Sequence, residues 1–525
     1  MILSEQISEF IIVGSGPAGV SAAWPLVLAG RSVVMIEAGE MRVSNSDKHE
    51  NFSLRQARNG SYGDFFQGKN ASKLFHEGFA SPKLRASGMD FKRYSELNRL
   101  DPVNFTLTGL IETGGLSRVW GASCACYDDD DLGDSPVKLK DLSRSYAEVG
   151  TRIGLSGNNL SPIARFIGDY LPLQGQLPLT PLMKRVMSEY ARRRKYDGIL
   201  LGETLSAVTS SSSHSRGACL GDMRCMWGCP HNSIYSADLD LPRLRSFSNF
   251  SFQPNIVIDD LLSIRNGTGS NWIVAGLNQS SGECVKFLSQ KVFLAMGIFA
   301  TTRLVIEKFL PKGTSLKVLH NPSFSSAMVI PKFIGGQVPH RGYGGSQLCF
   351  KLPLSDTKGD YAFGLIFDAA SLPAYELMRH MPFTRLGAIN AIRLLMPSML
   401  LLLVYLPPRL SQSRVEMAGD NRLKVYGGYV DGYQEIFSKC VRRMNSFFRQ
   451  LGIYTLPGST KGYQPGAEVH YGCTLSSTQF ISERSELNNA KGIYIVDGAA
   501  LPALTAKSHT LTIMANADRI ARSFL

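Results

Sequence analysis

The sequence lacks any apolar run long enough to cross a bilayer as a helix. The most apolar stretch, residues 394–406, is shorter than the roughly 20 residues that a membrane-spanning helix needs, and Pro397 interrupts it. We expect a buried strand there. Residues 1–5 lack the basic start and apolar core of a secretory signal, so we expect no signal and place the protein in the cytoplasm.

The chain also lacks a disulfide pattern and an excess of acid. Its nine cysteines are an odd number in 525 residues, which is untypical of a disulfide framework and agrees with a reducing compartment. The 56 basic residues outnumber 43 acidic ones, for a net charge of +13. These charges are spread along the chain without a nucleic-acid-binding motif, so we expect no nucleic-acid partner. Tyr375, Arg379, Arg385 and Arg393 lie among apolar residues between positions 375 and 407, which would suit peripheral membrane contact.

The length and composition indicate a folded protein of two domains. At 525 residues the chain exceeds a single core, and 44% hydrophobic with 19% charged residues is ordinary for a globular protein. Strand-like segments recur in the later half and predict a sheet-rich second domain between residues 311 and 455. They are residues 327–333, 346–351, 361–367 and 399–405.

A glycine-rich turn near the start joins an apolar strand to a helix. Gly14 permits the tight turn, Gly16 lets the backbone approach a pyrophosphate, and Gly19 lets the helix pack on the strand. The unpaired N–H groups at the start of the helix attract phosphate oxygens. Glu37 ends the next strand, where it can accept hydrogen bonds from a ribose diol. The pattern predicts a dinucleotide site, which FAD and NAD share.

Two later glycine segments bear on the choice between FAD and NAD. Residues 113–121 contain Gly114, Gly115 and Ser117 without helix or strand periodicity. Residues 292–297 read as an apolar strand that turns through Gly297 into a helix.

Together with residues 464–525, the C-terminal block, these segments resemble the glucose–methanol–choline oxidoreductases, and more closely their bacterial sugar-dehydrogenase and pyranose-oxidase-like branches. The resemblance implies an α/β fold. Residues 1–310 and 456–525 would form a Rossmann-like FAD-binding domain, and residues 311–455 an α+β substrate domain on a mostly antiparallel sheet. It also implies a set of FAD contacts: Gly14, Gly16, Gly19, Glu37, Gly114, Gly115, Ser117, Ala295, Gly297 and Asp497.

The chain departs from the family at Val119 and Trp120. Some relatives carry a histidine in this segment that bonds covalently to the flavin, and many have an asparagine near the flavin ring. Neither residue is present here, so we expect noncovalent FAD.

Two histidines in the C-terminal block resemble the family's paired active-site signature. His470 begins a His-Tyr-Gly-Cys-Thr segment, and His509 directly precedes the last predicted helix, residues 510–523. Oxidation of an alcohol needs a hydride acceptor and a base, and histidine suits the second task. On this interpretation His470 is the base, and His509 holds the substrate oxygen and shares the proton. The alternative is that both are ordinary structural histidines.

The expected activity is FAD-dependent oxidation of a hydroxyl group on a sugar, glycoside or polyol, with hydride transfer to the flavin. Oxidation of a nonsugar alcohol, such as a sterol-like or natural-product alcohol, is an alternative. A flavin-fold binding subunit without catalysis is another. The electron acceptor is not identified by the sequence.

Three cysteines close together form a further motif. The motif consists of Cys219, Cys225 and Cys229, and Pro230 follows the last of them. The spacing of the cysteines is similar to that of the cysteines that hold an iron–sulfur cluster in bacterial FAD sugar dehydrogenases. A zinc site completed by His231 or His214, and three thiols without metal, are the alternatives.

Overall fold

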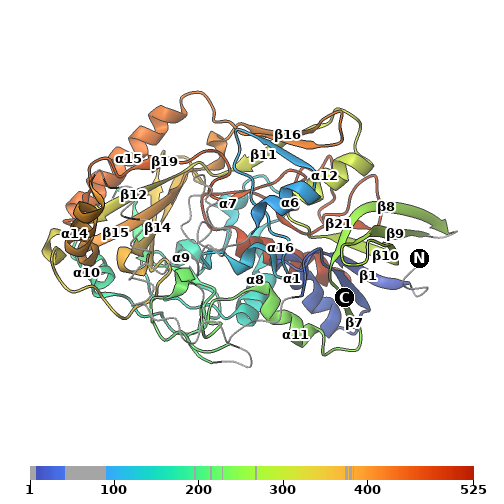
Figure 1. Ribbon diagram of the computed structural model, residues 1–525, viewed down its shortest axis with the longest axis horizontal. Helices are drawn as coiled ribbons and strands as arrows, with labels where there is room; N and C mark the ends of the chain where they lie inside the picture. The colour runs from blue at the N-terminus through green and yellow to red at the C-terminus, as the bar shows by residue number, and fades with distance from the viewer. Residues whose placement is uncertain are drawn as a thin grey trace.

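The computed structural model describes residues 7–41, 90–193, 197–212, 216–227, 229–266, 269–372, 377, 381 and 383–525. Tyr375, Arg379 and His214, named above, lie outside these residues. Figure 1 shows an elongated molecule with both chain ends at one end and helices α14 (Arg385–Leu395) and α15 (Tyr433–Gln450) at the other.

The first sheet is built from both ends of the chain. Its strand order is β7-β2-β1-β10-β9-β8, and β21 pairs with β10. The pairs β1–β2, β1–β10, β2–β7 and β10–β21 are parallel, whereas β8, β9 and β10 form an antiparallel meander. The bounds are β1 (Ser8–Val13), β2 (Val33–Ile36), β7 (Phe250–Gln253), β8 (Ile256–Asn266), β9 (Gly269–Asn278), β10 (Cys284–Leu294) and β21 (Ile493–Ile495).

Helix α1 (Pro17–Leu28) is apolar on all sides, and its residues 18–27 are all buried. It packs against the C-terminal helix α16 (Thr510–Arg522), which in turn packs against α8 (Leu139–Ile153). Gly30 has φ +77°, so the chain leaves α1 through a left-handed conformation that glycine adopts without strain. The first and last helices therefore share one core (Figure 1).

The second large sheet is antiparallel throughout, in the order β18-β12-β15-β14-β13-β5, and β19 also pairs with β12. Its apolar side chains share one cluster with residues of α10 (Pro181–Ala191) and α15. The strands are β5 (Leu200–Glu203), β12 (Ser323–Val329), β13 (Leu348–Pro353), β14 (Tyr361–Asp368), β15 (Met399–Tyr405), β18 (Tyr454–Thr455) and β19 (Lys461–Gly462).

A third sheet has the order β20-β11-β16-β17-β3. Its strands are β3 (Leu100–Val103), β11 (Ser315–His320), β16 (Ser413–Met417), β17 (Leu423–Tyr426) and β20 (Tyr471–Gly472), and the pair β4 (Ser123–Cys124) and β6 (Leu205–Ser206) forms a fourth. The other α-helices are α6 (Phe91–Leu97), α7 (Asp129–Leu132), α9 (Ala164–Ile167), α11 (Leu241–Leu244) and α12 (Ile298–Phe309).

The sheets confirm the predicted fold class, an α/β half with a largely antiparallel second half. The expectation of a strand over residues 394–406 was wrong at its start. Leu394 and Leu395 end helix α14, a short 3-10 turn (Met396–Ser398) contains Pro397, and only then does β15 begin. A continuous apolar run does not distinguish a strand from the end of a helix, and here the turn at Pro397 separates the two.

Candidate active site

One cavity of about 960 Å³ extends from the glycine turn after β1 to the segment that carries His470. Its lining includes residues of both large sheets and the start of α16. It takes in most of the predicted site residues: Gly14, Gly16, Glu37, Gly115, Ser117, Ala295, Gly297, His470, Asp497 and His509. Two others, Gly19 and Gly114, lie just behind the lining and shape it.

The glycines of the first turn serve different purposes. Gly14 has φ +107°, and a Cβ there would lie 2.3 Å from the carbonyl oxygen of Ala295. A Cβ on Gly19 would lie 1.9 Å from the carbonyl oxygen of Gly14. At Gly16, by contrast, a Cβ would meet no described protein atom within 4 Å. The fold itself requires Gly14 and Gly19, whereas Gly16 borders open cavity, as expected where a pyrophosphate approaches the backbone.

The second glycine segment lies directly against the first. The Gly114 N–H donates to Ser15 Oγ at 3.1 Å, and a Cβ on Gly115 would lie 3.5 Å from the Cα of Gly16. Ser117 Oγ donates to the Gly114 carbonyl oxygen at 2.6 Å and accepts from the Ala237 N–H at 2.9 Å. The structure thus brings these two segments together, and Ser117 holds the turn in place.

Glu37 is buried beneath the first turn. One carboxylate oxygen accepts from both the N–H and the hydroxyl of Ser15, at 2.8 and 2.6 Å, and the other accepts from the Gly39 N–H at 2.7 Å. Burial raises the pKa of this carboxyl, although these donors oppose the shift. Glu37 therefore organises the glycine turn, and it also lines the cavity.

Asp497 supports the start of helix α12. Its carboxylate accepts from the N–H groups of Gly297 and Ala499, both at 3.0 Å, and from the hydroxyl of Thr301 at 2.5 Å. Burial raises its pKa to about 6. These contacts tie the segment after β10 to the segment after β21, and they explain why an acid ends this strand.

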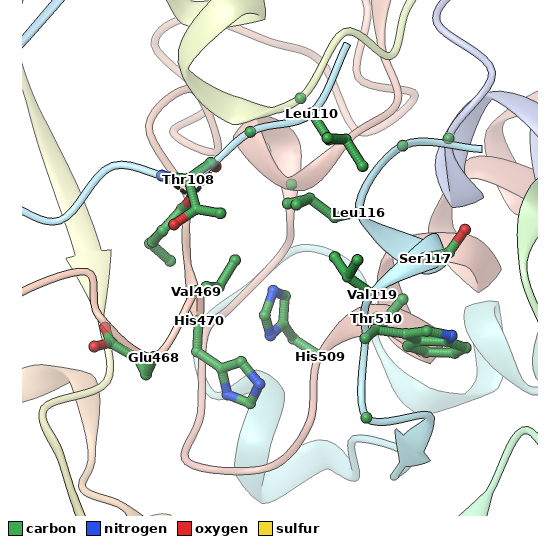
Figure 2. A pocket seen from close by; sticks show the side chains of 18 of the residues that line it. Thr108, Leu110, Leu116, Ser117, Val119, Glu468, Val469, His470, His509 and Thr510 are labelled. Atoms are coloured by element: carbon green, nitrogen blue, oxygen red, sulfur yellow. Dashed lines mark hydrogen bonds between the residues drawn. The ribbon is translucent and has the colours of Figure 1, made fainter. Parts of the chain in front are cut away.

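His470 and His509 meet in the cavity. Their ring centroids are 4.6 Å apart, with the planes at 82°. Figure 2 shows the two side chains next to each other. His470 immediately precedes β20, and its carbonyl oxygen accepts from the Asn321 N–H at 3.0 Å. His509 is the N-cap residue of α16. Pairing of β20 with β11 and packing of α16 on α1 therefore place the two rings together.

Burial lowers the pKa of both imidazoles. The pKa of His470 lies well below its ordinary value, mainly because the ring is buried and also because His509 is near. Burial lowers the pKa of His509 to about 4. His470 is only partly buried, and it lines the cavity. Each Nδ1 atom is buried and has no hydrogen-bond partner among the described residues. Both rings are neutral at pH 7, so each has one nitrogen able to accept a proton.

Sequence reasoning missed a buried acid–histidine pair beside His470. Glu468 and His320 are both fully buried, with the His320 Nδ1 3.1 Å from Glu468 Oε1. Burial raises the pKa of Glu468, and its other oxygen has no partner among the described residues. Its position two residues before His470 was the only available signal; His320 gave none, because strand β11 is distant in the sequence.

The backbone between Glu468 and His470 is strained. Val469 has φ +61°, a conformation that is an outlier for a β-branched residue. Such strain persists only where the surroundings impose it, and it is typical of functional sites. Here the Val469 N–H donates to the Gly466 carbonyl oxygen at 3.1 Å, and the side chain faces the cavity (Figure 2).

The segment that departs from the family pattern also lines the cavity. Val119 is buried, and the Trp120 Nε1–H donates to the Tyr235 carbonyl oxygen at 2.7 Å. Neither side chain can form the bond that a histidine makes to flavin, so noncovalent binding stays the prediction.

The three cysteines predicted to hold a metal centre lie among the described residues. Cys219, Cys225 and Cys229 form no disulfide in the described part of the chain, and Cys229 Sγ accepts from the Ser233 N–H at 3.2 Å. Over the part of the chain that the structure describes, no group of three or more His, Cys, Asp or Glu side chains could hold a metal ion. The geometry gives the predicted iron–sulfur cluster no support. Cysteine spacing alone sets neither the direction nor the convergence of the thiols.

Solved structures share this fold over nearly the whole chain. Pyridoxine 4-oxidase from Mesorbium loti is similar with a TM-score of 0.63 at 14% identity, covering 98% of this chain and 99% of that chain. A variant of formate oxidase from Aspergillus oryzae, solved for the effect of a mutation on FAD modification, is similar with a TM-score of 0.62 at 11% identity, covering 99% and 98%. No protein-family model and no curated protein sequence matches the chain. The chain therefore has the fold of these oxidases, which agrees with the resemblance stated from its motifs.

Proposed function

We propose that the protein is an FAD-dependent oxidoreductase that oxidises a hydroxyl group of a small molecule. The observation that carries the proposal is the continuity of one cavity from the Gly14–Gly16 turn to the rings of His470 and His509. The two similar structures named above are oxidases, and one concerns FAD modification, which supports the cofactor and the reaction class.

Residues around the turn suit the cofactor. The open space at Gly16 and the start of α1 offer room and positive potential for a pyrophosphate, and Glu37 borders the same space. FAD supplies a hydride acceptor when bound. We assign Gly14, Gly16, Gly19, Glu37, Gly114, Gly115, Ser117, Ala295, Gly297 and Asp497 to its site, with Gly14, Gly19, Ser117 and Asp497 acting through the backbone they hold.

The two histidines would handle the proton. Loss of hydride from carbon must be matched by loss of the hydroxyl proton, and a neutral imidazole can accept it. We assign this role to His470 and let His509 hold the substrate oxygen. The positive end of α16 begins at His509 and favours negative charge in this part of the cavity.

The walls near the histidines bear on the substrate. Ser325, Lys461 and Tyr463 offer polar groups on one side, with Ser325 Oγ 2.7 Å from Tyr463 Oη, and these suit a sugar, glycoside or polyol. The outer walls are apolar, with Leu372, Met399, Leu401 and Leu456 among them, and favour the second candidate, a nonsugar alcohol.

Anaerobic titration of the purified protein tests the proposal. The ultraviolet–visible spectrum should show bound flavin, and a substrate alcohol should bleach it. His470→Ala should keep the flavin spectrum and slow bleaching by roughly 100- to 10,000-fold. Reoxidation under air then tests oxygen as acceptor. A chain that binds no flavin, or a His470→Ala variant as fast as the wild type, would contradict the proposal and favour the noncatalytic alternative.

A further inference from the structure

Large apolar side chains are exposed together at the end of the molecule that carries α14. Leu386 and Leu394 lie on this helix and are 69% and 53% exposed, and Phe383, just before it, is 60% exposed. Ile334 follows a short 3-10 turn (Pro331–Phe333) and is 41% exposed. The Gly335 N–H donates to the Leu394 carbonyl oxygen at 2.9 Å, so the two segments touch. We call Ile334, Phe383, Leu386 and Leu394 the apolar surface.

This surface is basic. Lys332 lies two residues before Ile334, Arg393 lies beside Leu394, and both side chains are exposed. The sequence contains no aspartate or glutamate from residue 331 to 355 or from 377 to 415. Exposed apolar side chains interleaved with cations complement the headgroup region of an anionic bilayer.

The apolar surface also borders the cavity, which opens to solvent where its lining residue Phe383 is exposed. Phe383 belongs both to the surface and to the cavity lining, and Leu377, Met381 and Leu395 line the same end. From there, apolar walls lead to the chamber that holds His470 and His509. In Figure 1, α14 lies at the end of the molecule remote from both termini. A protein partner seated on this surface would close that opening, whereas a bilayer would supply it with lipophilic molecules.

We propose that the apolar surface rests on an anionic lipid bilayer and that the cavity takes its substrate from that bilayer. Phe383, Leu386, Leu394 and Ile334 enter the interface, while Lys332 and Arg393 contact lipid phosphates. The substrate is then an amphiphilic alcohol whose hydroxyl end reaches the histidines and whose apolar body lies along the outer walls. This last statement rests on the proposed function; the docking itself does not. The described helices include none that is long and apolar enough to cross the membrane.

Vesicle sedimentation tests the docking with the full chain. We expect co-sedimentation with vesicles of phosphatidylcholine mixed with phosphatidylserine, and much less with phosphatidylcholine alone. Leu386→Ser with Leu394→Ser should abolish it, and Lys332→Gln and Arg393→Gln should each weaken it by roughly fivefold. Leu160→Ser, at a site 93% exposed in a loop far along the sequence, and Lys92→Gln are matched controls that should bind as the wild type does.

Several outcomes would overturn the docking. They are wild-type protein that stays in the supernatant, surface variants that sediment as the wild type does, or control variants that lose binding equally. Self-association of the wild type that Leu386→Ser with Leu394→Ser removes, without vesicle binding, would assign the surface to a second copy instead. Circular dichroism of each variant confirms that it is folded.

A second readout separates this inference from the proposed function. Flavin reduction is followed with a short soluble alcohol and with a long-chain alcohol embedded in the anionic vesicles. The surface variants should lose reduction by the embedded alcohol and retain that by the soluble one. Vesicle binding without reduction by any alcohol would leave docking intact and count against the proposed function. If both alcohols reduce the flavin of the surface variants as fast as that of the wild type, the membrane inference is contradicted and the proposed function is not.

Discussion

Tyr405 stacks on His470, with ring centroids 4.2 Å apart and ring planes 13° apart. Tyr405 comes from β15 of the antiparallel sheet, whereas His470 precedes β20 of the smaller sheet. The aromatic face therefore fixes the plane of the imidazole from the side of strand β15, while His509 contacts it from the start of helix α16.

The stacking predicts a difference between two substitutions at one position. Tyr405→Phe keeps the aromatic face and should leave the rate of flavin reduction nearly unchanged. Tyr405→Leu removes it and should slow reduction by roughly 10- to 100-fold, because the base loses its fixed orientation. Rapid mixing with a substrate alcohol measures both rates. Equal rates in the two variants would show that the stacking does not position His470, and equal flavin content checks the fold.

The lowered imidazole pKa values predict that the acid limb of the pH–rate profile lies well below the ordinary titration range of histidine. The base stays neutral in the folded protein when pH falls below 6.5, so kcat/KM should remain level through pH 6 and decline only toward the lowered pKa values. The neighbouring Glu468 and Tyr405 have pKa values raised by burial and add no positive charge. A pH–rate profile over this range measures the limb, and a limb centred at or above 6.5 would contradict the assignment.

The same shifts predict how stability depends on pH. Below pH 6.5 the unfolded chain binds protons at these histidines that the folded chain does not bind. The free energy of unfolding should therefore fall as pH decreases from 6.5. The part of this fall that is due to His509 should be complete below about pH 4, where the ring is protonated in both states. Denaturant titrations of the wild type and of His509→Gln test this, since the variant should lose part of the dependence. An identical pH slope in both proteins would count against it.

Two glycines of one turn should behave oppositely. Gly14→Ala places a Cβ 2.3 Å from the Ala295 carbonyl oxygen at φ +107°, so it should lower the free energy of unfolding by more than about 1 kcal/mol. Gly16→Ala meets no described protein atom within 4 Å, so it should fold normally but weaken FAD binding by roughly tenfold or more.

Apo-protein unfolding and flavin titration separate the two effects. Gly419→Ala, whose Cβ also meets no described atom within 4 Å, is a matched control that should change neither quantity. Unimpaired flavin binding by the Gly16→Ala variant would show that the pyrophosphate does not bind at this turn.

The Glu468–His320 pair predicts a stability coupling beside the site. His320→Leu leaves a buried carboxyl without its donor and should lower the free energy of unfolding by about 1–3 kcal/mol. Glu468→Leu in the same chain removes the orphaned group, so the double variant should lose less than the sum of the two single variants. Denaturant unfolding of the four proteins measures the coupling; additive losses would show that the pair contributes no specific interaction.

The sequence by itself determined the strand–glycine turn–helix at residues 8–28, the last helix, and the placement of His509 at its start. These features follow from local causes: a positive φ at Gly14, apolar periodicity, and the spacing of the Glu37 strand. The same local rules failed at residues 394–396, where an apolar run belongs to a helix end.

Only the tertiary structure decided which residues meet. Pairing of β20 with β11 sets His320 against Glu468, β15 brings Tyr405 onto His470, and α14 exposes its apolar side chains beside the cavity opening. It also left the three cysteines without a metal centre among the described residues. Contacts between distant strands depend on sheet register and on the packing of whole layers, and no local pattern of residues encodes either.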